Sequence, residues 1–491
     1  MSEKQKMKQK SISQNAILNI IYTLINMIFP LLTFPYVSRI ILVDLLGRVS
    51  FYQSISSYVI MVASLGISTY GIRAVARCRD NDERLSKTTQ ELFIINSIGT
   101  IFVLIALCVS TLFVDRLKDD IYLLLINVLL IISAPFGMNW LYSGLEQYAF
   151  ITKRAIIVKV LSLLAIFVFV KAKEDYIIYA LIIALSSIIT YIINFTYSRR
   201  FISLKPTKHQ FKQHIKPMML LFSSILAINI YTHLDSAMLG FICDDRQVGL
   251  YTIAVYAKTA LLTMVNAISA VLLPRVSYYF SNDNTDALHV LLKKSISIIF
   301  MISIPITIFF IISARDCVLI LGGEEYIESV PCMQVIMPVL LISGFSNITG
   351  NQILIPQGKD SCFMKAVVCG AISDLIFNVL LMPRYGCLGA AIATLIAETI
   401  QMSIQLHYSK TIIQEDVNIR KIVIIIISTC ISVLAVYGIQ YFIKHGYVIT
   451  HFIISALVFF ISYLLALIAF KEEYLLSYIH DFKRRVLKKT T

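Results

Sequence analysis

Charged residues are scarce in this 491-residue chain. Asp, Glu, Lys and Arg make up 15% of it and hydrophobic residues 58%, whereas soluble domains average about 25% charged. No long linker separates soluble domains, and the longest polar gap runs only from 199 to 216. These absences exclude an ordinary soluble enzyme and a string of soluble modules.

Cysteine and histidine patterns that bind metals or carry redox chemistry are also missing. The nine cysteines are scattered, none lies in a C-x-x-C pair, and none has a histidine at metal-ligand spacing. We therefore expect no metal site and no catalytic residues, and we interpret the cysteines as small packing residues.

Long apolar stretches fill the chain almost from end to end. About 20 apolar residues in a helix span a hydrocarbon core of about 30 Å, and only helices satisfy the backbone there. The sequence predicts an all-α, polytopic integral membrane protein with fourteen transmembrane helices. The predicted spans are 13–41, 49–72, 90–114, 121–145, 151–170, 176–198, 217–242, 248–274, 295–314, 329–350, 362–382, 386–409, 422–443 and 447–470.

Positive charges alternate between successive gaps. If the N-terminus is cytoplasmic, 32 of the 43 Lys and Arg residues lie in inside segments, ten lie outside and Lys258 lies within a helix. This bias is what the positive-inside rule expects, so we predict that both termini are cytoplasmic. The net charge of +14 then faces anionic lipid, and nucleic acid is not an expected partner.

The polar gap after the sixth span divides the chain. We predict an N-terminal lobe at 1–200, a cytoplasmic linker at 201–216, a C-terminal lobe at 217–410, and two further helices with a basic cytoplasmic tail at 411–491. The segments 45–77 and 247–277 are weakly similar to each other, as two six-helix repeats in the same orientation require. Chance similarity between apolar helices is the alternative.

Five motifs in chain order resemble those of one family. They are NWLYSGLEQYAFITKRAIIVKV (139–160), NIYTHLDSAMLGFICDDRQVGLYTIAVYAK (229–258), VLLPRVS (271–277), LIPQGKD (354–360) and NVLLMPRYGCLGAAIATLIAE (378–398). The chain resembles the polysaccharide repeat-unit flippases of the multidrug/oligosaccharidyl-lipid/polysaccharide exporter superfamily. Asp374 departs from the family pattern, which often has Asn or another polar residue there.

The resemblance implies both a fold and a function. The fold is a MATE-like arrangement of two six-helix lobes around a cavity, with two extra C-terminal helices. The function is alternating-access transfer of oligosaccharide units on undecaprenyl diphosphate, from the inner to the outer leaflet of the bacterial cytoplasmic membrane, for capsule, exopolysaccharide or O-antigen synthesis. Expected partners are this lipid, membrane lipids, and the polymerase and glycosyltransferases of the pathway.

Two other classes stay open. One is a drug or cation antiporter of the same superfamily, which would favour acidic residues in the cavity. The other is a membrane enzyme of polysaccharide assembly, a polymerase or acyltransferase. An enzyme needs catalytic residues gathered at one membrane face and usually a large outer loop, and the sequence has neither. We therefore expect a transporter.

Ionisable residues inside the spans are the candidate site, because such residues are costly in lipid and mark function or pairing. Lys258 is a candidate ligand of the diphosphate, with Asp235 as its partner in a functional or purely structural ion pair. Further substrate-binding candidates are Arg39, Arg73, Arg154, Arg275, Tyr231 and Tyr256. Candidate carboxylates for a coupling ion, H⁺ or Na⁺, are Asp235, Asp374 and Glu398. Candidate gate residues are Glu146, which either pairs with Arg154 at the inner gate or simply lies at a helix end, and Pro30 and Pro35, which either let the first span bend during transport or form ordinary static kinks.

Overall fold

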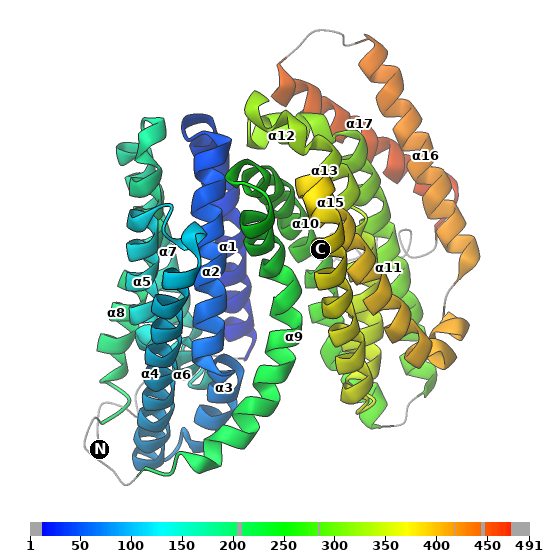
Figure 1. Ribbon diagram of the computed structural model, residues 1–491. Helices are drawn as coiled ribbons and strands as arrows, with labels where there is room; N and C mark the ends of the chain where they lie inside the picture. The colour runs from blue at the N-terminus through cyan, green and yellow to red at the C-terminus, as the bar shows by residue number, and fades with distance from the viewer. Residues whose placement is uncertain (1–11, 204–208, 283–284, 417, 443–446, 473–491) are drawn as a thin grey trace, which may run out of the picture. The chain divides into compact units, whose positions relative to one another are not determined.

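The computed structural model describes residues 12–203, 209–282, 285–416, 418–442 and 447–472. Within these ranges every regular element is helical and no β-strand occurs, which confirms the all-α prediction (Figure 1). The elements are α1 (Ile12–Ile40), α2 (Val43–Ser64), α3 (Ile67–Cys78), α4 (Asp82–Phe113), η2 (Asp115–Leu117), α5 (Ile121–Ser133), η3 (Ala134–Gly137), α6 (Asn139–Gly144), α7 (Tyr148–Phe169), η4 (Lys173–Asp175), α8 (Tyr176–Ser198), α9 (Lys212–Ile242), α10 (Asp245–Ser281), α11 (Thr285–Ile312), α12 (Ala314–Leu321), η5 (Glu324–Ser329), α13 (Val330–Ile336), α14 (Val339–Asn347), η6 (Ile348–Leu354), α15 (Asp360–Asp416), α16 (Ile419–Phe442) and α17 (Val448–Ala469).

Each of the fourteen predicted spans coincides with helical structure. Eleven described helical segments are long and apolar enough to cross a membrane. α7 and α9 account for two more predicted spans, and α15 contains two, because its backbone breaks at Gly386 (φ 51°, ψ −129°) three residues after Pro383. The fourteen-span prediction is therefore consistent with the helices observed.

Large apolar side chains point outward over most of these helices, as expected where the surroundings are lipid rather than water. On α4, Ile98, Phe102 and Phe113 are 61%, 72% and 81% exposed. On α17, Leu465 is 61% exposed. The chain is a multi-pass membrane protein.

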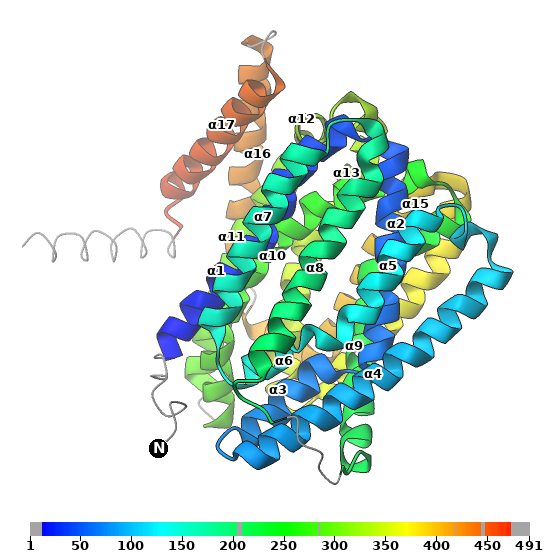
Figure 2. The same ribbon diagram turned by 90° about the vertical axis from the view of Figure 1, so that its left-hand side faces the viewer.

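Two compact units make up the chain, 1–249 and 250–491. In the first unit α7 packs on α8, α8 on α5, and α5 on α4, and these helices run side by side in Figure 2. α9 also belongs to this unit, where it packs on α2 and α3. The lobe boundaries predicted from the sequence remain a prediction.

The second predicted span is broken near its end. α2 ends at Leu65 (φ 45°) and Gly66 (φ 79°), and α3 starts immediately afterwards. Gly66 is required here, because its positive φ strains other residues and a Cβ would lie 2.9 Å from the backbone nitrogen of Phe222 on α9. The break allows α3 to follow its own direction beside α9.

The second unit is built around α11, which packs against α14, α15 and α16. Val265 and Val276 of α10 join Leu292, Ile299 and other apolar residues in one buried cluster. After α14 the chain widens into the π-helix η6. Such segments are rare and often accompany function.

Candidate functional site

A basic pocket lies between α3, α4 and α9 in the first unit. Tyr70, Arg73 and Arg77 of α3 line it, since residues three, four and seven apart share one helix face. Arg84 lies in the first turn of α4, where the Asn81 side chain caps the helix by accepting from the Arg84 amide. The complete lining is Tyr70, Arg73, Ala74, Arg77, Cys78, Arg84, Thr88, Gln213, His214 and Pro217, around a cavity of about 400 Å³.

Positive charge in this pocket is not neutralised by nearby carboxylates. Among the described residues, Arg73, Arg77 and Arg84 have no ion-pair partner. Arg79, one residue beyond α3, differs because its Nη1 lies 2.9 Å from Glu146 Oε1. Three guanidinium groups around one cavity attract anions, and their planar forks suit phosphate oxygens.

A buried carboxylate holds residues of the pocket lining in place by hydrogen bonds. Glu91 of α4 is fully buried, and its Oε2 lies 2.7 Å from His214 Nε2 of α9. Its Oε1 accepts from the Gln210 amide at 2.5 Å. His214 Nδ1 lies 2.8 Å from the Tyr70 hydroxyl. With Glu91 ionised, His214 donates through Nε2 and Tyr70 donates to Nδ1, which joins α3, α4 and the start of α9 in one chain of hydrogen bonds.

Arg154, predicted to bind substrate, lies in a different place. It is buried on α7, where it donates to Asn194 Oδ1 and, at 3.2 Å, to Asn139 Oδ1. Asn194 Nδ2 also donates to Asn139 Oδ1 at 3.1 Å. These contacts join α6, α7 and α8, and the substrate-binding role of Arg154 remains a prediction.

Glu146 and Arg154 do not pair with each other, so only the first of the two alternatives for Glu146 lacks support, and its gate role remains a prediction. Glu146 is exposed with a positive φ of 56°, and its carboxylate binds Arg79. Pro30 and Pro35 both lie within α1, which continues to Ile40. Arg39 lies in the last turn of α1, exposed, and donates to the Pro35 carbonyl.

The predicted ionisable residues of the later spans are divided between the units. Asp235 is buried on α9 in the first unit. Lys258 is partly buried on α10 in the second unit, so the proposed pair remains a prediction. Asp374 and Glu398 are buried on α15.

The remaining predicted substrate-binding residues are Tyr231, Tyr256 and Arg275. Tyr256 is partly buried and Arg275 is exposed, both on α10. The Tyr231 side chain lies outside the described residues. The fully buried Asn378 lies one turn after Asp374, so both face the same side of α15.

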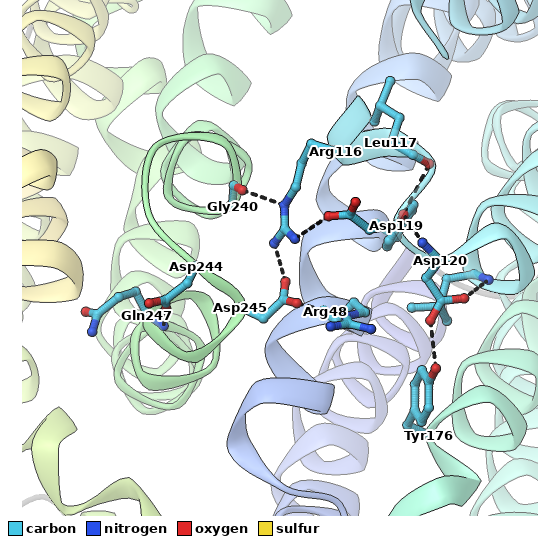
Figure 3. Close-up of polar contacts among 12 residues, drawn as sticks. Arg48, Arg116, Leu117, Asp119, Asp120, Tyr176, Gly240, Asp244, Asp245 and Gln247 are labelled. Atoms are coloured by element: carbon cyan, nitrogen blue, oxygen red, sulfur yellow. Dashed lines mark hydrogen bonds and ion pairs between the residues drawn. The ribbon is translucent and has the colours of Figure 1, made fainter. Parts of the chain in front are cut away.

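A second ionic cluster lies at the turn between α9 and α10. Asp245 accepts from Arg48 Nε of α2 at 2.8 Å and also pairs with Arg116 of η2 (Figure 3). Arg116 further donates to the Gly240 carbonyl and to Asp119, each at 2.8 Å. The turn is thereby attached to α2 at the predicted outer end of the first unit.

Sequence reasoning missed most of these contacts. It named Arg73 but not Arg77, Arg84 or His214 as site residues. The available signal was the density of basic residues between 73 and 87. The pairing of Glu91 with His214 joins residues 123 positions apart and has no local signal.

Comparisons with known proteins agree with this architecture. The family model described as "Polysaccharide biosynthesis protein" matches residues 12–280. A putative O-antigen transporter of Escherichia coli (strain K12) is 23% identical over 397 residues, which are 79% of this chain and 95% of that protein.

Solved structures give the same fold. A lipid II flippase MurJ in an inward closed conformation aligns with a TM-score of 0.74 at 15% identity, covering 94% of this chain and 99% of that one. An inward-facing multidrug resistance MATE family transporter aligns with a TM-score of 0.61 at 12% identity, covering 84% and 97%.

Proposed function

Because this chain belongs to the polysaccharide biosynthesis protein family, we propose that it is a flippase for lipid-linked oligosaccharides. It moves undecaprenyl-diphosphate-linked units from the inner to the outer leaflet of the bacterial cytoplasmic membrane, with both of its own termini in the cytoplasm. The family match over 12–280 is the observation that carries this proposal. The relative described as a putative O-antigen transporter and the fold shared with a lipid II flippase support it.

The chemistry of such a substrate requires a polar interior. A glycan and a charged diphosphate are both unfavourable in hydrocarbon, so their path must offer hydrogen bonds and cations. Buried ionisable groups inside membrane spans are costly unless they pair or function, and this chain retains Asp235, Asp374 and Glu398. Lys258 supplies a cation on α10 for the diphosphate, with Arg39, Arg275, Tyr231 and Tyr256 as further candidate ligands.

Alternating access coupled to an ion completes the proposal. A carrier must return empty, and an acid that loads H⁺ or Na⁺ on the outside favours that return. Asp235, Asp374 and Glu398 are the candidates. The fold shared with MATE transporters supports ion-coupled transport as a class.

The MATE-like fold also fits a drug or cation antiporter, which is the second candidate. The basic pocket argues against it, because Arg73, Arg77 and Arg84 repel cationic drugs. A polymerase or acyltransferase is the third candidate, and neither the family match nor the relatives' names support it.

Deletion of the gene tests the proposal. The mutant should accumulate lipid-linked repeat units on the inner leaflet and lose the surface polysaccharide, and the intact gene should restore both. Lys258→Ala should restore neither, whereas Lys258→Arg should restore part of the export. Normal surface polysaccharide in the deletion strain, with no stranded lipid-linked units, would show that another protein performs this transfer.

A further inference from the structure

We propose that the basic pocket between α3, α4 and α9 is a binding site for the phosphate groups of a lipid headgroup. One candidate lipid, undecaprenyl diphosphate, is chosen because of the proposed function. The phosphate chemistry itself rests only on the residues of the pocket.

The first argument is charge. Arg73, Arg77 and Arg84 line one cavity of about 400 Å³, and no ion-pair partner neutralises them within the part of the chain that the structure describes. Like charges brought together without a counter-ion repel one another, so an anion bound between them is stabilised by all three. Arginine binds phosphate through two parallel hydrogen bonds from one guanidinium group. A phosphate group has enough oxygens to accept hydrogen bonds from several arginines at once.

The second argument is that the buried carboxylate behind the pocket, Glu91, is already occupied by other partners. Glu91 is fully buried, and its two oxygens accept from the Gln210 amide and from His214 and Gln213. It therefore orients the wall instead of pairing with the arginines. The Tyr70 hydroxyl and the Gln213 side chain add uncharged polar groups to the lining.

The third argument concerns the two helices that carry most of the pocket. Ile72 of α3 and Ile215 and Met219 of α9 do not line the cavity, but they are 38%, 50% and 45% exposed on the same helices. Exposed apolar side chains on these helices suit contact with acyl or prenyl chains, which a soluble anion lacks. The pocket also lies beside the connection between α3 and α4, on the predicted cytoplasmic side, where lipid-linked substrates are assembled in the proposed function.

Binding to the full chain in phosphatidylcholine nanodiscs tests the site. Three probes are measured in separate arms by equilibrium binding of radiolabelled ligand: undecaprenyl diphosphate, phosphatidylglycerol and inorganic diphosphate. The variant Arg73→Gln/Arg77→Gln/Arg84→Gln should bind undecaprenyl diphosphate at least about tenfold more weakly than the parent, because hydrogen bonds to charged groups contribute strongly.

A matched variant controls for net charge. Lys153→Gln/Arg199→Gln/Arg200→Gln removes three exposed cations from the same predicted face but none from the pocket, and it should bind like the parent. The emission maximum of Trp140, the single tryptophan, checks that each variant is folded, since Trp140 is buried in the cluster that includes Ile67, Val75 and Met218.

The outcomes separate the possible ligands. If the pocket variant loses binding of phosphatidylglycerol to the same extent as binding of undecaprenyl diphosphate, the phosphate site is supported and is assigned to inner-leaflet phospholipid as well. Inorganic diphosphate binding as tightly as the lipid would overturn the lipid headgroup proposal, and so would equal weakening in both triple variants. The flippase proposal is judged separately by the deletion strain. If the deletion strain exports normally while the purified parent protein still binds the lipid through the three arginines, the proposed function fails and the phosphate site stands.

Discussion

At the scale of single residues, the described polar contacts fall into two kinds. Arg154 and Glu91 are buried and form hydrogen bonds with partners from other helices. Arg73, Arg77 and Arg84 are exposed to a cavity and lack such partners among the described residues. The first kind holds helices together, and the second kind is available for a ligand.

Loss of Glu91 should destabilise the first unit. Glu91→Ala leaves His214 and the Gln210 amide without their acceptor in a buried position, and removing one partner of such a network costs about 3 kcal/mol. We expect a clear fall in the temperature of the thermal transition followed by Trp140 fluorescence. The control Glu174→Ala, at an exposed carboxylate of the short helix η4, should leave that temperature unchanged. An equal effect in both variants would contradict the structural role of Glu91.

At the scale of elements, close packing joins the α9–α10 turn to α2. A Cβ on Gly47 would lie 1.8 Å from the Asp245 carbonyl oxygen, and one on Gly249 would lie 2.3 Å from the Val43 carbonyl oxygen. The two glycines allow backbones to approach, as small residues do between membrane helices. Asp245 then binds Arg48 and Arg116 across the contact.

A larger residue at Gly47 should separate the turn from α2. Gly47→Val places a side chain where the Asp245 carbonyl lies, and overpacking of this kind costs about 1–3 kcal/mol, or about 5–150-fold in an opening equilibrium. In a variant whose only cysteine is Cys243, which ends α9, labelling by an impermeant maleimide should become several-fold faster.

The matched control for this measurement is Gly438→Val on α16, where an added Cβ meets nothing within 4 Å. Labelling of Cys243 should not change in that background. If Gly47→Val also left the labelling rate unchanged, the contact between the turn and α2 would not limit access to Cys243.

At the scale of the whole molecule, the fourteen predicted spans and the alternation of basic residues between them predict the membrane orientation. Fourteen spans, an even number, would place both termini on one side, and the excess of Lys and Arg predicts that this side is the cytoplasm.

Cysteine labelling tests this orientation. In a cysteine-free variant, Lys118→Cys, Lys173→Cys and Arg384→Cys should react with an impermeant thiol reagent added outside intact cells. Asp80→Cys and Lys359→Cys should react only after permeabilisation. All five positions are exposed in the structure. Reaction of two or more positions from the opposite side would contradict the predicted topology.

The sequence alone determined the helical membrane fold, because the hydrocarbon core imposes a length and an apolar composition that can be read locally. It also indicated the family through ordered motifs, and it drew attention to Arg73 through local charge density. Only the tertiary structure decided that α3 separates from α2 at Gly66, that Glu146 binds Arg79, that Arg154 is held by Asn139 and Asn194, and that His214 reaches Glu91. Such pairings depend on which helix faces meet, and contacts between residues far apart in the chain leave no periodic signal within either segment.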